Sequence, residues 1–313
     1  MTRRQKKRPP CRLFYSGLLV LLTLVPTPAG EVVPPGKLSG EERETESEEW
    51  VYLQNEKLKI GFLKSHGAAL GYLSATENDN NVLNHYDRGR LVQQSYYGDP
   101  DQSKWVEKPW RFNPVQGGDY RGTPAKVLEF KSTETTAYAR TIPRHWASGE
   151  LVESCLMEQW AELEGNAIKM KYKFSYNGEK SHAARHQETP AVFVTPRLHT
   201  LVTYEGREPW KGGTLTRRSP GWPNERVRLS EPWAAWVDEQ GRGVGICVPG
   251  TLEATTYRFQ GGRGSSCSYI APLRTFALTP GLTFSYHAYL TLGSAEEIRR
   301  TFQALIDADL ITN

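Results

Sequence analysis

Short segments in which apolar and polar residues alternate recur along the chain, and this pattern constrains the fold more than any other feature. The segment EKLKIGFL places Leu58, Ile60 and Phe62 on one face of an extended chain, because successive side chains of a strand point to opposite sides. Comparable segments are AVFVTP, HTLVTY, AAWVDE, GVGICVP, TLEATTYRF and TFSYHAYLTLG. Gly, Pro and Asn mark the turns between them. Many short strands with almost no helical periodicity predict an all-β fold, a large antiparallel β-sandwich.

One long hairpin and one helix are also predicted. CLMEQWAELE and AIKMKYKFSY are joined across EGN, a short Gly-containing turn, which indicates two long antiparallel strands. Near the C-terminus, Ser294 is a suitable N-cap and Glu297 follows three residues later, which is a capping box. An apolar stripe at helical spacing follows it, formed by Ile298, Phe302, Leu305 and Ile306. We expect this helix to pack on one edge or face of the sandwich.

The first thirty residues are expected to lie outside the fold. The basic stretch MTRRQKKRPP precedes an apolar run from Leu13 to Val25, and PTPAG follows it. This order is typical of a secretory signal peptide, here residues 1–30. An uncleaved N-terminal membrane anchor is the alternative. We therefore expect a secreted or periplasmic protein with no membrane partner once the signal has been cleaved.

The next segment, residues 31–49, predicts a disordered tether because it is rich in Pro, Gly and acidic residues and has almost nothing to bury. Residues 50–313 then remain for a single β-sandwich domain. The formal net charge of +4 includes the basic signal region, so this domain is close to neutral. Nucleic-acid-binding proteins normally carry a basic stripe, and we expect no nucleic-acid partner here.

The cysteines leave two alternatives open. Cys155, Cys247 and Cys267 follow the signal region, and an odd number cannot pair completely. One disulfide with a free thiol and three buried thiols are both compatible with this count. The sequence has no CxxC spacing that would suggest zinc, and we expect neither a metal nor a cofactor.

The stretch NHYDRGRLVQQSYYGDP, residues 84–100, holds a dense set of hydrogen-bonding side chains. Arginine and glutamine make directional hydrogen bonds to hydroxyls or a carboxylate, and a tyrosine ring offers a flat apolar face to a sugar. In a strand, the even-numbered residues from Arg90 to Tyr96 would face one side and the odd-numbered residues from Leu91 to Tyr97 the other. The predicted binding residues are Asp87, Arg88, Arg90, Gln93 and Gln94. The alternative is a solvated edge strand with one buried ion pair.

A second candidate segment is WVEKPWRFNPVQGGDYRG, residues 105–122. It is predicted to be a loop in which two tryptophans form an aromatic platform, and such loops often carry function. Its predicted binding residues are Trp110, Asn113 and Gln116. A structural loop held in place by tryptophan is an equally good interpretation.

The third segment, SHAARHQETPAVF, combines histidines with a carboxylate before an apolar strand. Histidine transfers protons near neutral pH, and a glutamate beside a cation can act as a base or nucleophile. The predicted catalytic residues are His182, His186 and Glu188, together with Tyr97, and the predicted binding residues here are Arg185 and Gln187. The spacing of the two histidines also permits zinc, but HEXXH is absent. A surface loop with histidines bonded to the backbone is the alternative.

A fourth segment, RFQGGRGSSCSY, is rich in glycine but lacks the GK(S/T) ending of a phosphate loop. We expect a loop at the rim of a sugar cleft, in which Arg263 binds an anionic group. Four tryptophans between the third and fourth segments belong to the same aromatic set: Trp210, Trp222, Trp233 and Trp236.

The two ends of the β region are similar to one known superfamily. The opening LQNEKLKIGFLKSHGAALGYLSATENDNNVLNHYDRGR resembles the first strands of the galactose mutarotase-like supersandwich, and FALTPGLTFSYHAYLTLG resembles its final turn and long strand. The resemblance implies that fold and a carbohydrate substrate. The superfamily includes epimerases and domains of polysaccharide lyases and glycoside hydrolases, so the fold does not choose the reaction.

The resulting hypothesis is an enzyme that acts on a sugar polymer in a concave cleft. A lyase would use tyrosine or histidine to remove a proton next to a uronate carboxylate that arginine or glutamine neutralises. A hydrolase would need two carboxylates, here Glu188 with Asp87 or Asp119. A non-catalytic carbohydrate-binding protein is the alternative, and a structural envelope protein would leave the polar clusters dispersed.

Overall fold

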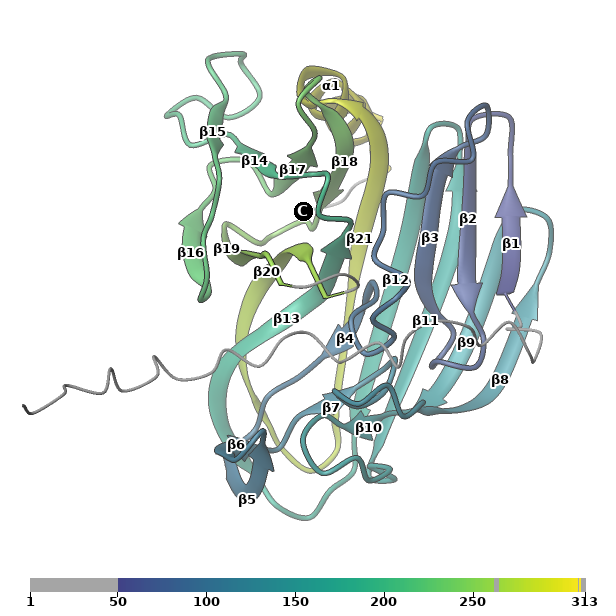
Figure 1. Cartoon of the computed structure of the whole chain (residues 1–313), viewed down its shortest axis with the longest axis vertical. Coiled ribbons are helices and arrows are strands. Elements are labelled where there is room, and N and C mark those ends of the chain that lie inside the picture. The colour runs from purple at the N-terminus through teal and green to yellow at the C-terminus, as the bar shows by residue number, and fades with distance from the viewer. Residues whose placement is uncertain (1–49, 262–264, 309, 311–313) are drawn as a thin grey trace, which may run out of the picture. The chain divides into compact units, whose positions relative to one another are not determined.

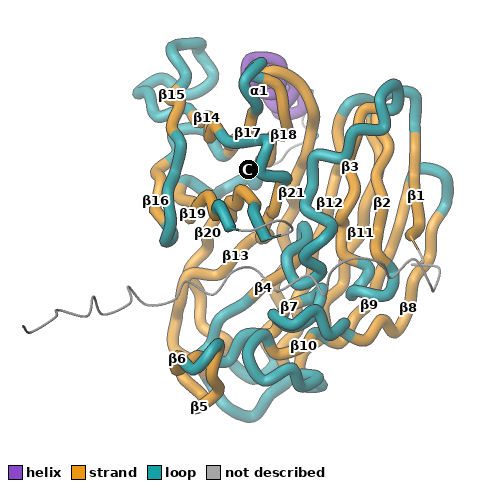
Figure 2. The backbone as a smooth tube through the Cα atoms, viewed as in Figure 1, coloured by secondary structure: helices purple, strands orange, loops and turns teal. Residues whose placement is uncertain are grey.

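The structure is a computed structural model that describes residues 50–261, 265–308 and 310. The predicted signal peptide, the predicted tether and Arg263 lie outside these residues. Figure 1 labels the strands and the helix, and Figure 2 shows that strands dominate the described part of the chain.

The strands form four antiparallel sheets. The first sheet has the order β1 (Trp50–Gln54), β2 (Leu58–Leu63) and β3 (Ala69–Ala75). The nine-stranded sheet has the order β15 (Thr216–Arg218), β14 (Thr200–Thr203), β17 (Trp233–Val237), β18 (Arg242–Cys247), β21 (Leu282–Ser294), β12 (Ala167–Tyr176), β11 (Cys155–Glu164), β9 (Thr136–Ile142) and β8 (Lys126–Ser132). The seven-stranded sheet has the order β10 (Arg144–His145), β7 (Pro114–Val115), β4 (Gln93–Ser95), β13 (His182–Val194), β20 (Cys267–Leu278), β19 (Glu253–Phe259) and β16 (Glu225–Arg228). A separate hairpin pairs β5 (Pro100–Trp105) with β6 (Lys108–Arg111).

The main hydrophobic core lies between the nine-stranded sheet on one side and the seven-stranded and three-stranded sheets on the other. Met170 of β12 and Trp236 of β17 belong to the same buried cluster as Ile60 of β2 and Val192 of β13. In the long strands of these sheets, alternate residues enter this core, because the side-chain period of a strand is two. The described residues therefore form an all-β sandwich, as the sequence predicts.

The predicted long hairpin and helix are both present. β11 pairs with β12 from Cys155↔Tyr176 to Glu164↔Ala167. Helix α1 (Ala295–Asp307) begins at the N-cap Ser294, whose side chain and that of Glu297 form the predicted capping box. Its buried residues Ile298 and Phe302 cover the outer face of β17, β18 and β21, the face turned away from the main core.

Two segments that the sequence predicts as loops contain strands instead. Residues 105–122 hold the end of β5, all of β6 and β7, and His182–Val194 is one continuous strand, β13. Within β13, a bulge lies between Glu188 and Val192. Central pairing of β13 with β20 and β4 overrides the polar composition of its first half, since strand propensity depends on the neighbouring strands.

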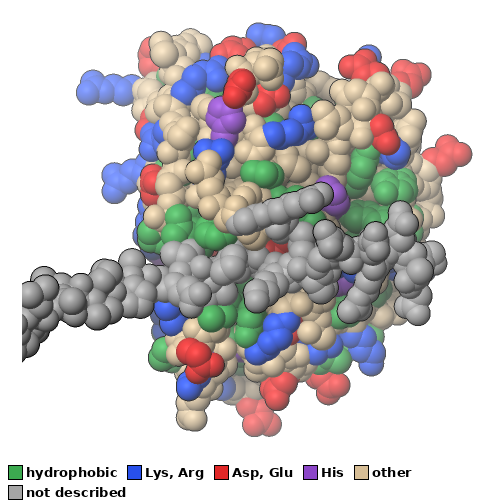
Figure 3. Space-filling model, viewed as in Figure 1, with side chains coloured by type: hydrophobic (Ala, Val, Ile, Leu, Met, Phe, Trp, Pro, Cys, Tyr) green, Lys and Arg blue, Asp and Glu red, His purple; other side chains and the backbone are tan. Residues whose placement is uncertain are grey.

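Cys155, Cys247 and Cys267 are all buried and free, so the alternative of three buried thiols is the correct one. Among the described residues, no group of acidic, histidine or cysteine side chains is arranged to hold a metal ion. No helix in the same residues has the length and apolar character to cross a membrane. On the face drawn in Figure 3, Lys and Arg side chains are interspersed with Asp and Glu.

Candidate functional site

A cavity of about 260 Å³ lies on the outer face of the seven-stranded sheet. Here Phe193 and Tyr269 point away from the main core, while their neighbours Val192 and Ile270 point into it. The volume is just below the usual range of roughly 300–1,000 Å³ for small-molecule pockets. We call this cavity the Glu188 pocket. Its lining consists of Gly89, Arg90, Gln93, Ser95, Tyr97, Trp105, Trp110, Asn113, Val115, Trp146, Glu188, Ala191, Phe193, Trp222, Pro223, Asn224, Tyr257 and Tyr269.

Glu188 is a buried carboxylate in the lining of this pocket. Its Oε1 accepts hydrogen bonds from the hydroxyl of Tyr97 at 2.8 Å and from that of Tyr269 at 2.5 Å. Burial raises the pKa of Glu188, while the hydroxyls of Tyr269, Tyr97 and Ser95 act in the opposite direction because they favour the ionised form. The pKa of each of these tyrosines is raised well above its usual value, first by burial and then by the charge of Glu188.

A buried ion pair supports another part of the pocket lining, at Arg90. Arg90 Nη1 donates to Asp87 Oδ2 at 2.7 Å, and both side chains are almost completely buried. The guanidinium carbon of Arg90 also lies 4.7 Å from the ring centroid of Trp146. Asp87 thus compensates the positive charge that Arg90 brings to the pocket. One buried ion pair in this stretch is part of the predicted alternative.

Aromatic rings form two walls of the pocket. On one side, Trp105 packs edge-on against Trp110 at 4.8 Å and against Trp146 at 6.0 Å. On the other side, Tyr257 lies 4.7 Å from Trp222 and stacks on Tyr269 at 4.6 Å. Aromatic walls with a few polar groups between them are typical of pockets for small organic ligands.

The β5–β6 hairpin carries two of these tryptophans and is held at its base by one ion pair and one hydrogen bond. Arg185 Nη2 donates to Asp99 Oδ1 at 2.8 Å, and His145 Nε2 lies 2.8 Å from Asp101 Oδ2. His145 Nδ1 accepts from two backbone amides, so the ring proton is on Nε2 and is donated to Asp101. These contacts fix the hairpin relative to β10 and β13.

The fold brings three of the predicted segments together. Ser95 of β4 pairs with Glu188 of β13, so the polar stretch 84–100 lies beside the histidine–glutamate segment. Within the first stretch, Gln93, Ser95 and Tyr97 face the pocket, while Gln94 and Tyr96 face the interior, which is the predicted alternation. Arg90, predicted to lie on the side of Gln94, lines the pocket instead because it precedes the strand. Predicted site residues that line the pocket are Arg90, Gln93, Tyr97, Trp110, Asn113 and Glu188.

Two predicted binding residues lie between the sheets instead. Gln94 donates to the carbonyl of Glu158 at 3.0 Å, and Gln116 donates to Gln159 Oε1 at 2.7 Å. Gln94 N also donates to Gln116 Oε1 at 3.2 Å. These amides satisfy polar groups in the interior, because the strand alternation that turns Gln93 outward turns Gln94 inward.

The two histidines do not reach the pocket. His182 is buried and stacks on Phe112 at 4.7 Å, and its Nδ1 accepts from the backbone amide of Asp99. Burial lowers the pKa of His182. His186 bonds instead to Thr275 of the neighbouring strand at 3.0 Å. Their positions support the framework around the β5–β6 hairpin and β20.

The remaining predicted residues also have framework contacts. The side-chain amide of Gln187 hydrogen-bonds the backbone of residue 97 and the backbone carbonyl of residue 276. Arg185 forms an ion pair with Asp99. Asp87 supports Arg90 from outside the lining, and Arg88 is half-buried and also outside it. Asp119, the other proposed partner of Glu188, is buried and accepts from the amides of residues 121 and 123. Neither proposed second carboxylate therefore lines the pocket.

Several pocket residues were not predicted, namely Ser95, Trp146, Phe193, Asn224, Tyr257 and Tyr269. Tyr269 has the most consequence because it donates to Glu188. Its strand alternates as CSYIAPL, but only the pairing of Tyr269 with Phe193 places it beside β13. That pairing is a long-range contact with no local sequence signal.

Comparison with solved structures identifies the fold. A galactose mutarotase-like protein from Lactobacillus casei has 12% identity and a TM-score of 0.54, and the match covers 78% of this chain and 100% of that chain. A galactose mutarotase related enzyme from Lactobacillus acidophilus has 10% identity and a TM-score of 0.52, with 78% and 97% covered. A putative aldose 1-epimerase from Escherichia coli K12 has 11% identity and a TM-score of 0.51, with 78% and 99% covered.

No protein-family model and no curated protein matches the sequence. At these identities the structural matches establish the fold, which is galactose mutarotase-like, as the sequence resemblance implies.

Proposed function

We propose that the protein is a carbohydrate-active enzyme that binds one sugar ring in the Glu188 pocket and transfers a proton on that ring. The observation that carries this proposal is the buried Glu188 carboxylate, bonded to Tyr97 and Tyr269 between two aromatic walls. Aromatic faces suit the C–H side of a pyranose, and the amides and hydroxyls between them suit its hydroxyl groups.

Glu188 is the proton acceptor in this proposal. Its raised pKa brings a carboxyl group closer to neutral pH, where a general base works most efficiently. Tyr97 and Tyr269 are suitable proton donors, because each already shares a hydrogen bond with Glu188 and recovers its proton from it. Burial of Glu188 and Tyr269 limits the access of water that would compete for the proton, and Tyr97 beside them is half-buried.

Of the two reactions predicted from the sequence, the pocket favours elimination over hydrolysis. Hydrolysis by the common mechanism needs a second carboxylate, and Glu188 is the only one in the described lining of the pocket. In the elimination, Glu188 takes the proton next to a uronate carboxylate and the bond to the leaving sugar oxygen breaks. A double bond forms in the ring, and a tyrosine hydroxyl donates a proton to the leaving oxygen.

Interconversion of sugar anomers is a second candidate, which the names of the similar structures favour. Two of them are called mutarotase-like or mutarotase related, and one is called a putative aldose 1-epimerase. The same groups would suffice, because ring opening needs a base at the anomeric hydroxyl and an acid at the ring oxygen. A pocket of about 260 Å³ also suits a single ring.

A substrate screen separates the alternatives. The purified protein is incubated with uronate-containing polysaccharides, neutral polysaccharides and free aldoses. Ultraviolet absorbance of unsaturated products, reducing ends and optical rotation are recorded. Absorbance together with reducing ends is the expected result. Reducing ends without absorbance would indicate hydrolysis, and a change of rotation alone would indicate anomer interconversion.

The variant Glu188→Gln tests the role of the carboxylate. Gln keeps the shape of the side chain and still accepts from the two tyrosines, but it cannot take a proton. We expect turnover to fall by about 10²–10⁴-fold while sugar binding, measured by calorimetry, persists. Glu296→Gln is the matched control, since Glu296 is an exposed helix residue paired with Arg217. Sugar binding by both variants without turnover by the unmodified protein would identify a non-catalytic binding protein.

A further inference from the structure

A second surface depression of about 380 Å³ lies on the outer face of the nine-stranded sheet. Helix α1 covers this face over β17 and β18 and the end of β21, where Phe302 and Ile298 pack on the sheet. The depression lies beyond the helix, over β8, β9, β11, β12 and the middle of β21. We call this surface the Trp160 face.

Five of its residues form a continuous row across five neighbouring strands. The strand register pairs each member of the row with the next: Lys131↔Tyr138, Tyr138↔Trp160, Trp160↔Lys171 and Lys171↔His287. Neighbouring strands are about 4.8 Å apart, so the row is ~19 Å long from first to last strand. Such a length suits several linked units of a ligand chain rather than one small molecule.

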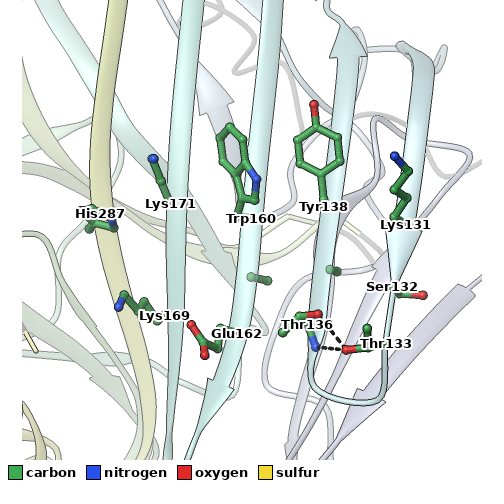
Figure 4. Close-up of a pocket in the computed structure, with 12 residues that line it drawn as sticks. Lys131, Ser132, Thr133, Thr136, Tyr138, Trp160, Glu162, Lys169, Lys171 and His287 are labelled. Carbon is green, nitrogen blue, oxygen red and sulfur yellow. Dashed lines mark hydrogen bonds between the residues drawn. The ribbon is translucent and has the colours of Figure 1, made fainter.

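The centre of the row is an aromatic surface. The rings of Tyr138 and Trp160 lie 5.1 Å apart and are tilted by 41°. Figure 4 shows them side by side, with Lys171 on one side of the pair and Lys131 on the other. Both aromatic side chains are half-buried, so part of each ring is open to solvent. Flat exposed rings suit the stacking of sugar rings.

The charges of this face are not balanced within it. In the adjacent row, Glu158 pairs with Lys173 at 2.9 Å and accepts from the hydroxyl of Tyr138 at 2.9 Å. Lys171 instead lies 5.2 Å from the ring centroid of Trp160. Among the described residues, neither Lys169 nor Lys171 has an acidic partner within 4 Å, although Glu162 stands opposite Lys169 in the register.

The pKa of His287, at the end of the row, reflects the same excess of positive charge. Its pKa is lowered first by burial and then by the positive charges of Lys169 and Lys171. A local excess of positive charge next to an aromatic surface is complementary to a ligand that carries both anionic groups and ring faces.

We propose that the Trp160 face binds an anionic oligosaccharide, a sugar chain that bears carboxylate or sulfate groups. Its rings would lie on Tyr138 and Trp160, and its anionic groups would meet Lys169 and Lys171. A membrane surface is less suitable, because both rings are half-buried and leave little apolar surface that could insert into lipid.

This site is independent of the Glu188 pocket. The pocket lies on the outer face of the seven-stranded sheet, and the main core separates that sheet from the nine-stranded one. The two sites therefore open on opposite sides of the sandwich. An oligosaccharide on the Trp160 face would hold the protein on a polymer without occupying the pocket.

Binding is tested by calorimetry with three probes of similar length: an oligogalacturonide, a sulfated dextran oligosaccharide and an unmodified dextran oligosaccharide. We expect the anionic probes to bind more tightly than unmodified dextran, and to weaken as salt is added. The two anionic arms distinguish carboxylate from sulfate. Equal affinity for the neutral probe would overturn the assignment of an anionic ligand.

Substitutions then locate the binding. We expect Lys169→Gln with Lys171→Gln to weaken binding by about tenfold or more, and Trp160→Ala to weaken it at least as much. Trp160→Tyr should retain binding, because it keeps an aromatic face. It is the control that separates loss of the ring from misfolding of the protein. The matched charge control, Lys57→Gln with Lys211→Gln, removes two exposed lysines outside this face and should change little.

Two further measurements separate the alternatives. Glu188→Gln should leave the affinity of the Trp160 face unchanged, so that failure of the proposed enzyme activity does not affect this test. Unchanged affinity in Trp160→Ala would overturn the proposal. Lysine-dependent binding to vesicles with anionic lipids, without binding to the oligosaccharides, would assign the face to a membrane instead.

Discussion

Two opposing effects act on the ionisation of Glu188. Burial favours the neutral acid, whereas three hydroxyl groups favour the carboxylate. Burial is the larger effect, and the pKa of Glu188 is raised above its usual value of 4.5. The cost of burying a charge at this position appears in the dependence of stability on pH, which can be measured without knowledge of the substrate.

We predict that Glu188→Gln becomes progressively more stable than the unmodified protein as the pH rises above 4.5. In the folded protein the pKa of Glu188 is raised, so ionisation costs folding free energy that the neutral glutamine does not. The difference should be constant below pH 4.5 and should grow until the pH passes the folded-state pKa. Urea unfolding of both proteins from pH 4 to pH 8 measures it. A gap that closes with rising pH would contradict a raised pKa.

The buried amide network gives a second prediction for a single residue. Gln159 accepts from Gln116 at 2.7 Å and donates to the carbonyl of residue 68. Gln159→Leu removes both bonds and leaves buried polar groups without these partners, which costs about 1–3 kcal/mol of unfolding free energy. Gln240→Leu, at an exposed turn, should change it by less than about 0.5 kcal/mol. Equal effects of the two substitutions would show that the network contributes nothing.

The position of a side chain is predicted correctly where it depends only on residues nearby in the sequence. Alternation along one strand correctly separates Gln93 and Tyr97 from Tyr96, because it depends only on neighbours in sequence. The same alternation turns Gln94 to the interior, so the prediction that its amide binds a ligand is wrong. Tyr269 could not be predicted, since its contact with Glu188 joins strands that are 81 residues apart.

At the scale of elements, the β5–β6 hairpin is the part of the site that has no recognisable signal in the sequence. Val106 and Glu107 form a two-residue turn in which both φ angles are positive, 47° and 62°. Such turns usually carry Asn-Gly, so this sequence lacks the signal of a hairpin and predicts a loop. By contrast, β11, β12 and α1 follow from local patterns: a glycine turn and a capping box.

The anchoring of this hairpin should affect ligand binding more than stability. Asp101→Asn weakens the bond to His145, and we expect affinity for the pocket ligand to fall several-fold because Trp105 and Trp110 lose their fixed position. Asp101 is partly exposed, so the change in unfolding free energy should stay below about 1 kcal/mol. Calorimetry and thermal unfolding measure the two effects.

A matched control for the hairpin is Lys104→Gln, which breaks an exposed ion pair with Glu107 on the same element. It should change neither affinity nor stability measurably. If Asp101→Asn lowers the melting temperature strongly but spares affinity, the hairpin base is part of the core framework and does not position the pocket wall.

For the whole molecule, the prediction of a single domain over residues 50–313 depends on how the cores are connected. The main cluster joins residues of β2, β13 and the nine-stranded sheet. Three of the smaller clusters around it contain one cysteine each: Cys155, Cys247 under α1, and Cys267 near the Glu188 pocket. The thiols are therefore probes of three separate parts of the fold.

We predict that the three thiols react with a labelling reagent at the same slow rate. Burial raises the pKa of Cys155 and Cys267 to about 12, and it also raises that of Cys247, so little reactive thiolate forms in the folded protein. In a single cooperative domain, each thiol then becomes accessible only through global unfolding. Pulsed alkylation in increasing urea, followed by mass spectrometry of the peptides, measures each rate. Faster labelling of Cys247 than of the other two would show that α1 opens separately, and three different midpoints would divide the sandwich into independent units.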